Sequence, residues 1–307
     1  MKLRLARYAC STVAVLAVLI IAANAQTTDF SKVELKTTKI AGNFYTIEGP
    51  GGTIGVLTGP DGVLMVDAQF APLSDKIMTE IRKVSNGQVR ILINTHVHGD
   101  HTGGNENFSK MGAMIFAREE VRNRLEHPAP AANGNPTPPA PAAALPVVTF
   151  RGPLTFHFDG EDVEAIPIPS AHTDGDTIVR FAKADVIMAG DFYRSTGYPN
   201  IDRGNGGSLK GMLDGLDVMI KAAGPNTKIV PGHSPVGLVS DKAAVTAHRD
   251  MIIAIRDRVA KLVQQGKSQA EVVAAKPTAD YDSKIPGSAS TSERFVGQLY
   301  AEMKPAK

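Results

Sequence analysis

The chain has 307 residues, of which 43% are hydrophobic and 21% are charged, and this composition excludes a fibre, a coiled coil or a disordered polymer. Its 33 basic and 31 acidic side chains nearly balance, so they supply no single-signed field for phosphates and argue against a nucleic-acid partner. A single cysteine can form neither a disulfide framework nor a cysteine-based metal cluster within the chain, so histidines and carboxylates must hold any bound metal.

Residues 1–25 have the pattern of a secretory signal peptide. Lys2, Arg4 and Arg7 precede an apolar run over residues 13–23, and a small-residue cleavage site ends at Ala25. A transmembrane anchor needs about 20 apolar residues, so the shorter run favours a cleaved signal over an anchor. Cleavage would leave a domain of residues 26–307 with no cysteine and a formal charge of −1 in place of +2. We expect a periplasmic or secreted protein with no membrane attachment after cleavage.

Strand patterns dominate the first half of the chain. Segments 43–48, 54–58 and 62–67 are rich in β-branched and aromatic residues and are separated by Gly-Pro-Gly-Gly and Gly-Pro-Asp-Gly, which are turn sequences. A helix is predicted to follow from Ser74, with apolar residues at helical spacing, and residues 89–95 form another short apolar strand.

The middle of the chain, residues 128–146, contains seven prolines, seven alanines and no charged residue. This composition is too poor in large apolar groups to pack a core. It predicts a surface loop or a linker between two halves. A lid over an active site is the alternative, because long loops are often functional.

The second half repeats the strand pattern over residues 154–158, 163–168, 177–182 and 185–189. A helix follows Ser208 and ends before Gly224-Pro225, and helices with apolar faces fill residues 241–304 and are expected to cover a sheet. Two β-rich halves with helices outside predict an α+β fold built as a four-layer αββα sandwich, although other α+β packings fit the same periodicity.

A histidine cluster follows the strand that ends at Thr95. His96 and His98 are two residues apart in an extended stretch, so they point to the same side and can approach one ion. Asp100 and His101 lie past the turn and can face a second ion. Without a metal, these polar groups would cluster with no partner, so the segment predicts a metal site.

Further candidate ligands follow other apolar strands. His172 comes after residues 166–170, Asp191 after 186–190 and His233 after 228–232, so all three can converge on one rim of the sandwich. The remaining histidines lack this setting and are expected at the surface: His127, His157 and His248.

The motif His96-x-His98-x-Asp100-His101, followed in order by His172, Gly190-Asp191 and Gly232-His233, resembles the metallo-β-lactamase superfamily over roughly residues 40–240. The resemblance implies that His96, His98 and His172 bind one zinc ion, that Asp100, His101 and His233 bind a second, and that Asp191 bridges both. Asp67 matches a position where the family often keeps an aspartate behind a ligand histidine; the alternative for Asp67 is a turn residue at a strand end.

Asp191 departs from the β-lactamase pattern within this family. The cysteine-containing β-lactamase subclasses have cysteine at this position, and the all-histidine subclass has no bridging aspartate there. An aspartate after glycine is similar to glyoxalase II and quorum-lactone lactonases, which argues against a dedicated β-lactamase. Export, however, suits an antibiotic-facing enzyme better than glyoxalase II or a tRNA-processing nuclease. The flavodiiron branch of the family prefers glutamate at the position of His98, so the sequence argues against that branch as well.

The resemblance implies hydrolysis by a hydroxide shared between two Zn²⁺ ions, with Asp100 as a ligand that also orients it. No side-chain nucleophile is needed. Tyr193 is a candidate donor to the oxyanion, or an aromatic residue that only packs.

Three functions follow as hypotheses. The first is an exported dinuclear zinc hydrolase that opens cyclic amides or esters, with β-lactamase activity. The second is a lactonase or thioesterase without useful β-lactamase activity, and the third is a non-enzymatic metal-binding or partner-binding protein. The expected partner is a small-molecule substrate. Its identity lies in loops that motifs do not determine, and the oligomeric state is not encoded in these patterns.

Overall fold

The computed structural model describes residues 28–130 and 134–304, so the predicted signal peptide lies outside the described residues. The chain divides into a short unit, Met1–Lys32, and a large unit, Val33–Lys307. The short unit contributes one described 3-10 helix, Phe30–Lys32. Among the described helices, none combines the length and the apolar character needed to cross a membrane.

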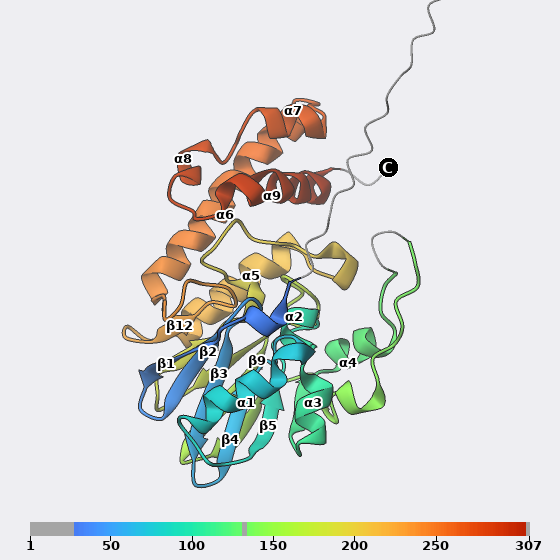
Figure 1. Cartoon of the computed structure of the whole chain (residues 1–307). Coiled ribbons are helices and arrows are strands. Elements are labelled where there is room, and N and C mark those ends of the chain that lie inside the picture. Colours follow the sequence, from blue (N-terminus) through green and yellow to red (C-terminus); the bar gives the residue numbers. More distant parts are fainter. Residues whose placement is uncertain (1–27, 131–133, 305–307) are drawn as a thin grey trace, which may run out of the picture. The chain divides into compact units, whose positions relative to one another are not determined.

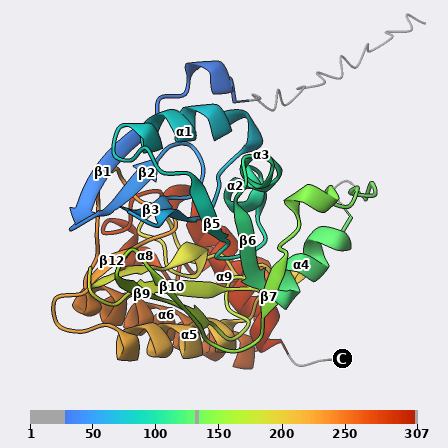
Figure 2. The same cartoon turned by 90° about the horizontal axis from the view of Figure 1, so that it is seen from below.

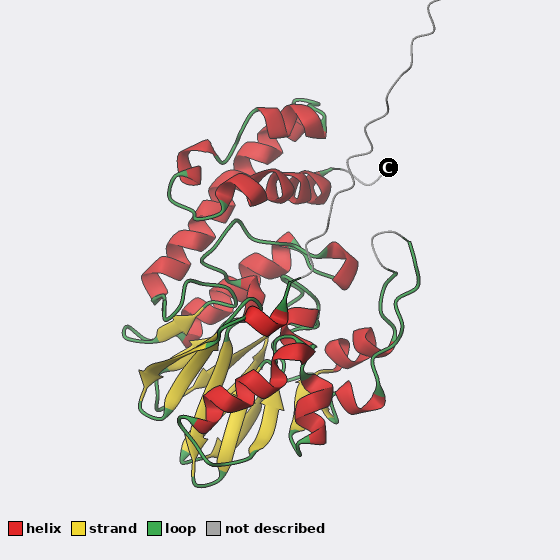
Figure 3. Ribbon diagram, in the orientation of Figure 1, coloured by secondary structure: helices red, strands yellow, loops and turns green. Residues whose placement is uncertain are grey.

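Two β-sheets form the centre of the large unit (Figures 1 and 3). The first has seven strands in sequence order, antiparallel from the first to the fourth and parallel from there to the seventh: β1 (Lys36–Ala41), β2 (Phe44–Glu48), β3 (Ile54–Gly59), β4 (Gly62–Val66), β5 (Val89–Ile93), β6 (Met114–Arg118) and β7 (Val148–Phe150). The second has five strands in the order β12-β11-β10-β9-β8, with only the β11 and β12 pair parallel: β8 (Leu154–Phe158), β9 (Glu161–Pro167), β10 (Thr177–Phe181), β11 (Val186–Met188) and β12 (Lys228–Val230).

Helices cover the outer faces of both sheets. In Figure 2, α1 and α3 lie outside the first sheet, whereas α5 and α6 lie outside the second, which confirms the predicted four-layer αββα sandwich. The helices of the described residues are α1 (Ser74–Arg82), α2 (Gly99–Thr102), α3 (Asn105–Lys110), α4 (Glu119–Glu126), α5 (Leu209–Ala222), α6 (Lys242–Gln264), α7 (Gln269–Ala274), α8 (Ala279–Asp282) and α9 (Ser288–Met303).

Local sequence chemistry sets several of these elements. Ser208 accepts a hydrogen bond from the backbone N–H of Gly211 at the start of α5, and Asp241 caps α6 in the same way through Ala244. Ser268 and Glu271 form a reciprocal capping box on α7. The capped helices α5 and α6 therefore begin where the sequence predicts.

The apolar core has two layers that hold the sheets in place. Between the sheets, the Phe44 and Phe181 rings lie 4.4 Å apart, amid other fully buried side chains such as Leu64 and Val179. Beneath the second sheet, Ile187 and Leu216 belong to a second buried cluster that extends into α6 and α9. Burial of this apolar surface stabilises the sandwich and fixes the strand ends that carry the polar motifs.

The segment 128–146 does not link the two halves, because the chain after it returns to the first sheet as β7, paired with β6. The interpretation as an inter-half linker is therefore wrong. The connection between the sheets is the short turn after Phe150. Near the end of the segment, Asn105 donates a hydrogen bond to the Ala144 carbonyl at 3.1 Å, and Arg122 donates one to the Pro146 carbonyl at 2.6 Å. Its lid role stays a prediction.

Candidate metal centre

Four polar side chains of the metal centre come from one short segment after β5. The expected extended stretch is a bend over residues 95–97 that contains His96, whereas His98 has an extended backbone. The chain then turns into α2, where the backbone N–H groups of His101 and Thr102 bond to the His98 carbonyl. This turn brings Asp100 and His101 toward a second position. The compact spacing of the motif thus produces two adjacent groups of ligand atoms.

Three further side chains come from ends of strands in the second sheet. His172 lies in the loop after β9, Asp191 in a 3-10 helix (Gly190–Phe192) after β11, and His233 directly after β12. Gly190 has a φ of 61°, a conformation that favours glycine. At Gly232 an added Cβ would lie 2.2 Å from an Asp191 carboxylate oxygen, so this close approach requires glycine.

The structure brings together all seven predicted ligands. Ligand atoms lie within 4.8 Å of one another in each of three groups: His96 with His98 and His172, His96 with His101 and Asp191, and Asp100 with His101 and His233. The first and third groups are the two sets that the family resemblance implies. Asp191 lies between them.

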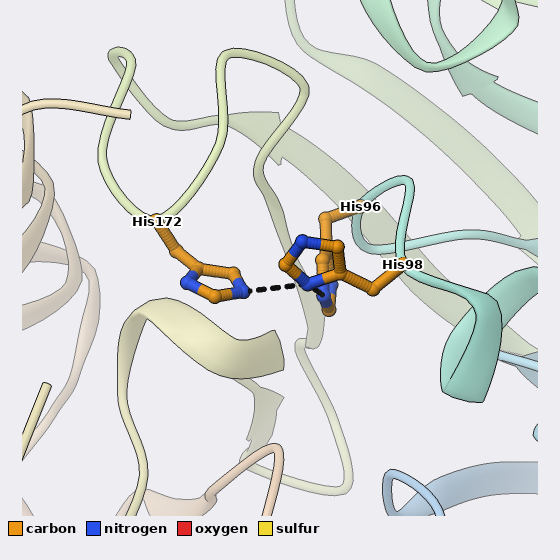
Figure 4. Close-up of side chains that lie close together, drawn as sticks. All are labelled: His96, His98 and His172. Carbon is orange, nitrogen blue, oxygen red and sulfur yellow. Dashed lines mark hydrogen bonds between the residues drawn. The ribbon is translucent and has the colours of Figure 1, made fainter. Parts of the chain in front are cut away.

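In the first group, three ring nitrogens face one another (Figure 4). His98 Nδ1 lies 3.1 Å from His96 Nε2 and 2.9 Å from His172 Nε2. The opposite ring nitrogens have other partners: His172 Nδ1 donates to the Asn200 carbonyl at 2.7 Å, and His98 Nε2 donates to Asp202 at 2.7 Å. In a neutral ring one nitrogen donates and the other accepts.

His96 follows the same pattern through Thr95. The Thr95 hydroxyl donates to Asp67, so it accepts from His96 Nδ1 at 3.1 Å. The three facing nitrogens therefore carry lone pairs, which repel one another unless a cation lies among them. Burial lowers the pKa of His96 well below its usual value and that of His172 to about 4, which keeps both rings neutral and able to ligate.

In the second group, carboxylates alternate with imidazoles. His233 Nε2 lies 3.1 Å from an Asp100 oxygen and 3.2 Å from Asp191, whereas His101 Nε2 lies 3.2 Å from the other Asp191 oxygen. Within the described part of the chain, His101 Nε2 and Asp191 Oδ1 are buried without a hydrogen-bond partner. Two orphaned buried ligand atoms that face each other fit a metal ion.

The carboxylates of this group favour their charged form. Burial raises the pKa of Asp191, but the neighbouring His101 and His233 side chains outweigh it, so the pKa falls well below its usual range. The pKa of Asp100 falls to about 2, because its bond with His233 outweighs burial. Both side chains are thus ionised near neutral pH, as metal ligation requires.

Asp67 lies behind His101, at the end of β4. Its carboxylate accepts hydrogen bonds from His101 Nδ1 at 2.7 Å, from the Thr95 hydroxyl at 2.7 Å and from the Thr95 backbone N–H at 2.8 Å. The residue is 1% exposed and has a φ of 64°. The side chain therefore fixes the His101 ring with Nε2 directed at Asp191, which is how a carboxylate orients a metal-binding histidine.

Sequence reasoning missed two aspartates that hold the centre. Asp202 accepts the hydrogen bond from His98, and this bond lowers the pKa of Asp202. The Asn205 side chain donates another hydrogen bond to Asp202 at 2.7 Å. Asp176 accepts bonds from the backbone N–H groups of His172 and Thr173 and so fixes the His172 loop. Asp176 lies only four residues after His172 in the sequence, but no local pattern connects Asp202 with a histidine 104 residues away.

The structure also bears on the predictions for Tyr193 and for the three histidines outside the ligand set. The Tyr193 hydroxyl donates to Ser240 at 2.9 Å, which agrees with the packing alternative and not with an oxyanion donor. His248 contacts the Tyr193 ring at 5.1 Å and has a buried Nε2, so the prediction of a surface position is wrong. His127 and His157 are exposed, as predicted.

Comparisons with known proteins agree with this geometry. Residues 47–233 match the metallo-beta-lactamase superfamily. A metallo-beta-lactamase from Pontibacter korlensis is 19% identical and superposes with a TM-score of 0.58, covering 71% of this chain and 99% of that one. The DIM-1 metallo-beta-lactamase is 17% identical, with a TM-score of 0.58 and coverage of 72% and 98%.

A double mutant of the sec-alkyl sulfatase PisA1 is 16% identical, with a TM-score of 0.67. That similarity covers 89% of this chain, which spans 52% of the sulfatase. At these identities the likeness concerns the fold alone. The match over residues 47–233 includes every residue of the two ligand groups, and the chain belongs to the metallo-β-lactamase superfamily.

Proposed function

We propose that this chain is an exported dinuclear zinc hydrolase that opens cyclic amides and esters, with modest β-lactamase activity. The observation that supports it best is the pair of ligand groups joined by Asp191. A cluster of lone pairs and carboxylates without a competing structural role fits two cations better than it fits a packed core. Imidazole dominates the donor set, which favours zinc, and the carboxylate bridge softens that preference.

Bound zinc ions would supply Lewis acidity and lower the pKa of a coordinated water. The predicted ligands divide into those that only hold the ions and those that also face the substrate. His96, His101 and His172 are at most 1% exposed and can only hold ions. The side chains of His98, Asp100 and His233 are 20–26% exposed, so substrate approaches from their side. There, Asp100 can accept a hydrogen bond from water and orient it.

The choice of substrate follows from Asp191 and from the N-terminal segment. A carboxylate in place of a thiolate makes the centre richer in oxygen ligands, as in the lactonase type of member. The N-terminal signal pattern supports a location that β-lactams reach and that cytosolic thioesters do not. The similar structures include two β-lactamases and an alkyl sulfatase, so sulfate esters belong among the test substrates.

The test is one panel of substrates assayed with one zinc-loaded preparation: a chromogenic cephalosporin, a homoserine lactone, a thioester and a secondary alkyl sulfate. We expect about two zinc equivalents per chain by elemental analysis. We expect kcat/KM for the best β-lactam at or below about 10⁴ M⁻¹s⁻¹, together with activity on a lactone or ester. Chelation should abolish both.

Each other result contradicts part of the proposal. A β-lactam rate near the diffusional ceiling would identify a specialised β-lactamase, whereas lactone cleavage without any β-lactam cleavage would identify the lactonase alternative. Bound zinc without turnover of any substrate would favour the non-enzymatic alternative. Activity that survives removal of all metal would refute the mechanism.

A further inference from the structure

A cavity of about 370 Å³ lies between the segment that follows Asp191 and the helices of the C-terminal region. Its volume is within the range of roughly 300–1,000 Å³ that is typical of small-molecule sites. Much of its wall is apolar or aromatic, including Tyr193, Met251, Tyr281 and Ile285. None of the seven predicted metal ligands lines it. The cavity is therefore a separate feature that the metal chemistry does not explain.

The charged groups of the cavity wall are basic. Arg194 and Lys284 line it, and no ion pair joins either to a carboxylate among residues 28–130 and 134–304. The pKa of Arg294 is lowered mainly by burial and also by the nearby charge of Arg194. The cavity wall thus presents two basic side chains, Arg194 and Lys284, that an anion would stabilise.

Two polar atoms at the cavity lack partners. Arg194 Nε and His248 Nε2 are buried, and neither makes a hydrogen bond to the described residues. Natural proteins rarely leave such groups unpaired, so each calls for an explanation. Both atoms are inaccessible to solvent in this structure, so a ligand in the cavity would satisfy them only after a movement of the two side chains.

The cavity wall is joined to the metal centre by backbone hydrogen bonds. The Ser195 backbone N–H bonds to the His233 carbonyl at 3.1 Å, and the Gly232 N–H bonds to the Tyr193 carbonyl at 3.1 Å. Residues 193–195 also follow Asp191 directly in the chain. The same segment therefore carries a predicted metal ligand and one side of the cavity, so occupation of the cavity can act on the position of that ligand.

We propose that this cavity binds the part of the substrate remote from the scissile bond, and that this part is an apolar group of intermediate length that bears an anionic substituent. Arg194 pairs with the anion, and Met251, Ile285 and the two tyrosine rings contact the apolar portion. The role of the cavity in substrate binding rests on the proposed hydrolase function. The binding of an amphiphilic anion itself does not depend on that function.

The first experiment measures binding without turnover. Hexane-1-sulfonate is titrated into the zinc-loaded protein by calorimetry, because a sulfonate is a poor zinc ligand and will report the cavity and not the metals. We expect one site, with at least tenfold weaker binding of methanesulfonate and of hexan-1-ol. Arg194→Gln should weaken hexane-1-sulfonate at least tenfold. Arg256→Gln is the control, because it removes an arginine from the surface of α6, the helix that supplies Met251 to the cavity wall. This variant should bind hexane-1-sulfonate as the wild type does.

The second experiment connects binding to turnover of an ester. Hexane-1-sulfonate should raise KM without lowering kcat. Ala247→Phe, which places a ring at the edge of the cavity, should reduce kcat/KM for a hexanoyl ester more than for an acetyl ester. The Arg256→Gln control should preserve the wild-type ratio.

Each result bears on the proposal. No binding of hexane-1-sulfonate, or equal binding by wild type and Arg194→Gln, overturns the cavity assignment whatever the enzyme hydrolyses. Binding that leaves KM unchanged overturns the substrate role. If no substrate in the panel is hydrolysed, the proposed function fails, while the calorimetric series still decides whether the cavity takes amphiphilic anions.

Discussion

The two sheets contribute to the metal centre in different ways. The first sheet supplies His96, His98, Asp100 and His101 from one strand end, whereas the second sheet supplies three ligands from three separate strand ends. In the first case the local backbone sets the spacing of the ligands. In the second, each ligand depends on its own loop and on the neighbours that fix it. Part of the site is therefore encoded locally and part is assembled by the fold.

Replacing the bridging residue breaks the link between the two contributions, and we expect it to have the largest effect. Asp191→Asn keeps the shape of the side chain but removes the charge that lies between the two ligand groups. The variant should fold, lose metal mainly from the group of Asp100, His101 and His233, and lose more than about 100-fold in kcat, as for removal of a key electrostatic group. Elemental analysis, circular dichroism and kinetics check this. Unchanged zinc content and rate would make Asp191 a turn residue.

The residues behind the histidines sharpen the comparison, because Asp67 follows a strand of the first sheet directly whereas Asp202 lies in a loop far beyond a strand of the second. Asp67→Asn and Asp202→Asn should each lower zinc affinity by about 10–100-fold, since each replaces the charged carboxylate that orients one imidazole with a neutral amide. Competition with a chromogenic chelator measures this loss. Asp214→Asn, which alters an exposed aspartate paired with Lys210 on α5, is the matched control and should have no effect. If only Asp67→Asn lowered affinity, the contribution of Asp202 would be structural.

The smallest predicted effect concerns a histidine outside the metal centre. Burial lowers the pKa of His248 to about 4, below the unfolded value of about 6.5. The unfolded chain therefore binds more protons between these values, and stability is lost as pH falls from about 6.5 to 4. His248→Gln should reduce this loss by about 1–2 kcal/mol, a value discounted for partial exposure.

Denaturant unfolding of the metal-free protein at pH 7 and pH 4.5 measures the pH dependence of stability. His157→Gln, at a side chain that is 82% exposed, should leave it unchanged. An equal change in both variants would show that burial of His248 does not affect its titration.

The sequence allowed prediction of the elements and ligands that depend on local pattern. Most strands of both sheets, the starts of α1 and α5, and the ligands at strand ends follow from periodicity, capping and position. Strand pairing does not follow from these, and β1, β6 and β7 of the first sheet were not predicted as strands. Asp202 acts on His98 only through the tertiary fold. No spacing rule could have found it.

His248 is a different case, because its signal was present. It lies three residues after Val245 and four before Ile252, which are both buried on α6, so it falls on the apolar stripe of that helix. We assigned it to the surface because it does not follow a strand end as the predicted ligands do. The spacing was the better guide, and it also indicates which side of α6 faces the cavity.

The division of ligands between the sheets has a mechanical consequence. Once bound, the ions would cross-link distant parts of the chain, because His98 and His172 belong to different sheets and so do His101 and His233. Closing such long loops restricts the unfolded chain strongly. A protease cut within the proline-rich segment 128–146 should therefore leave two fragments that migrate together while zinc is bound and separate more readily when it is chelated.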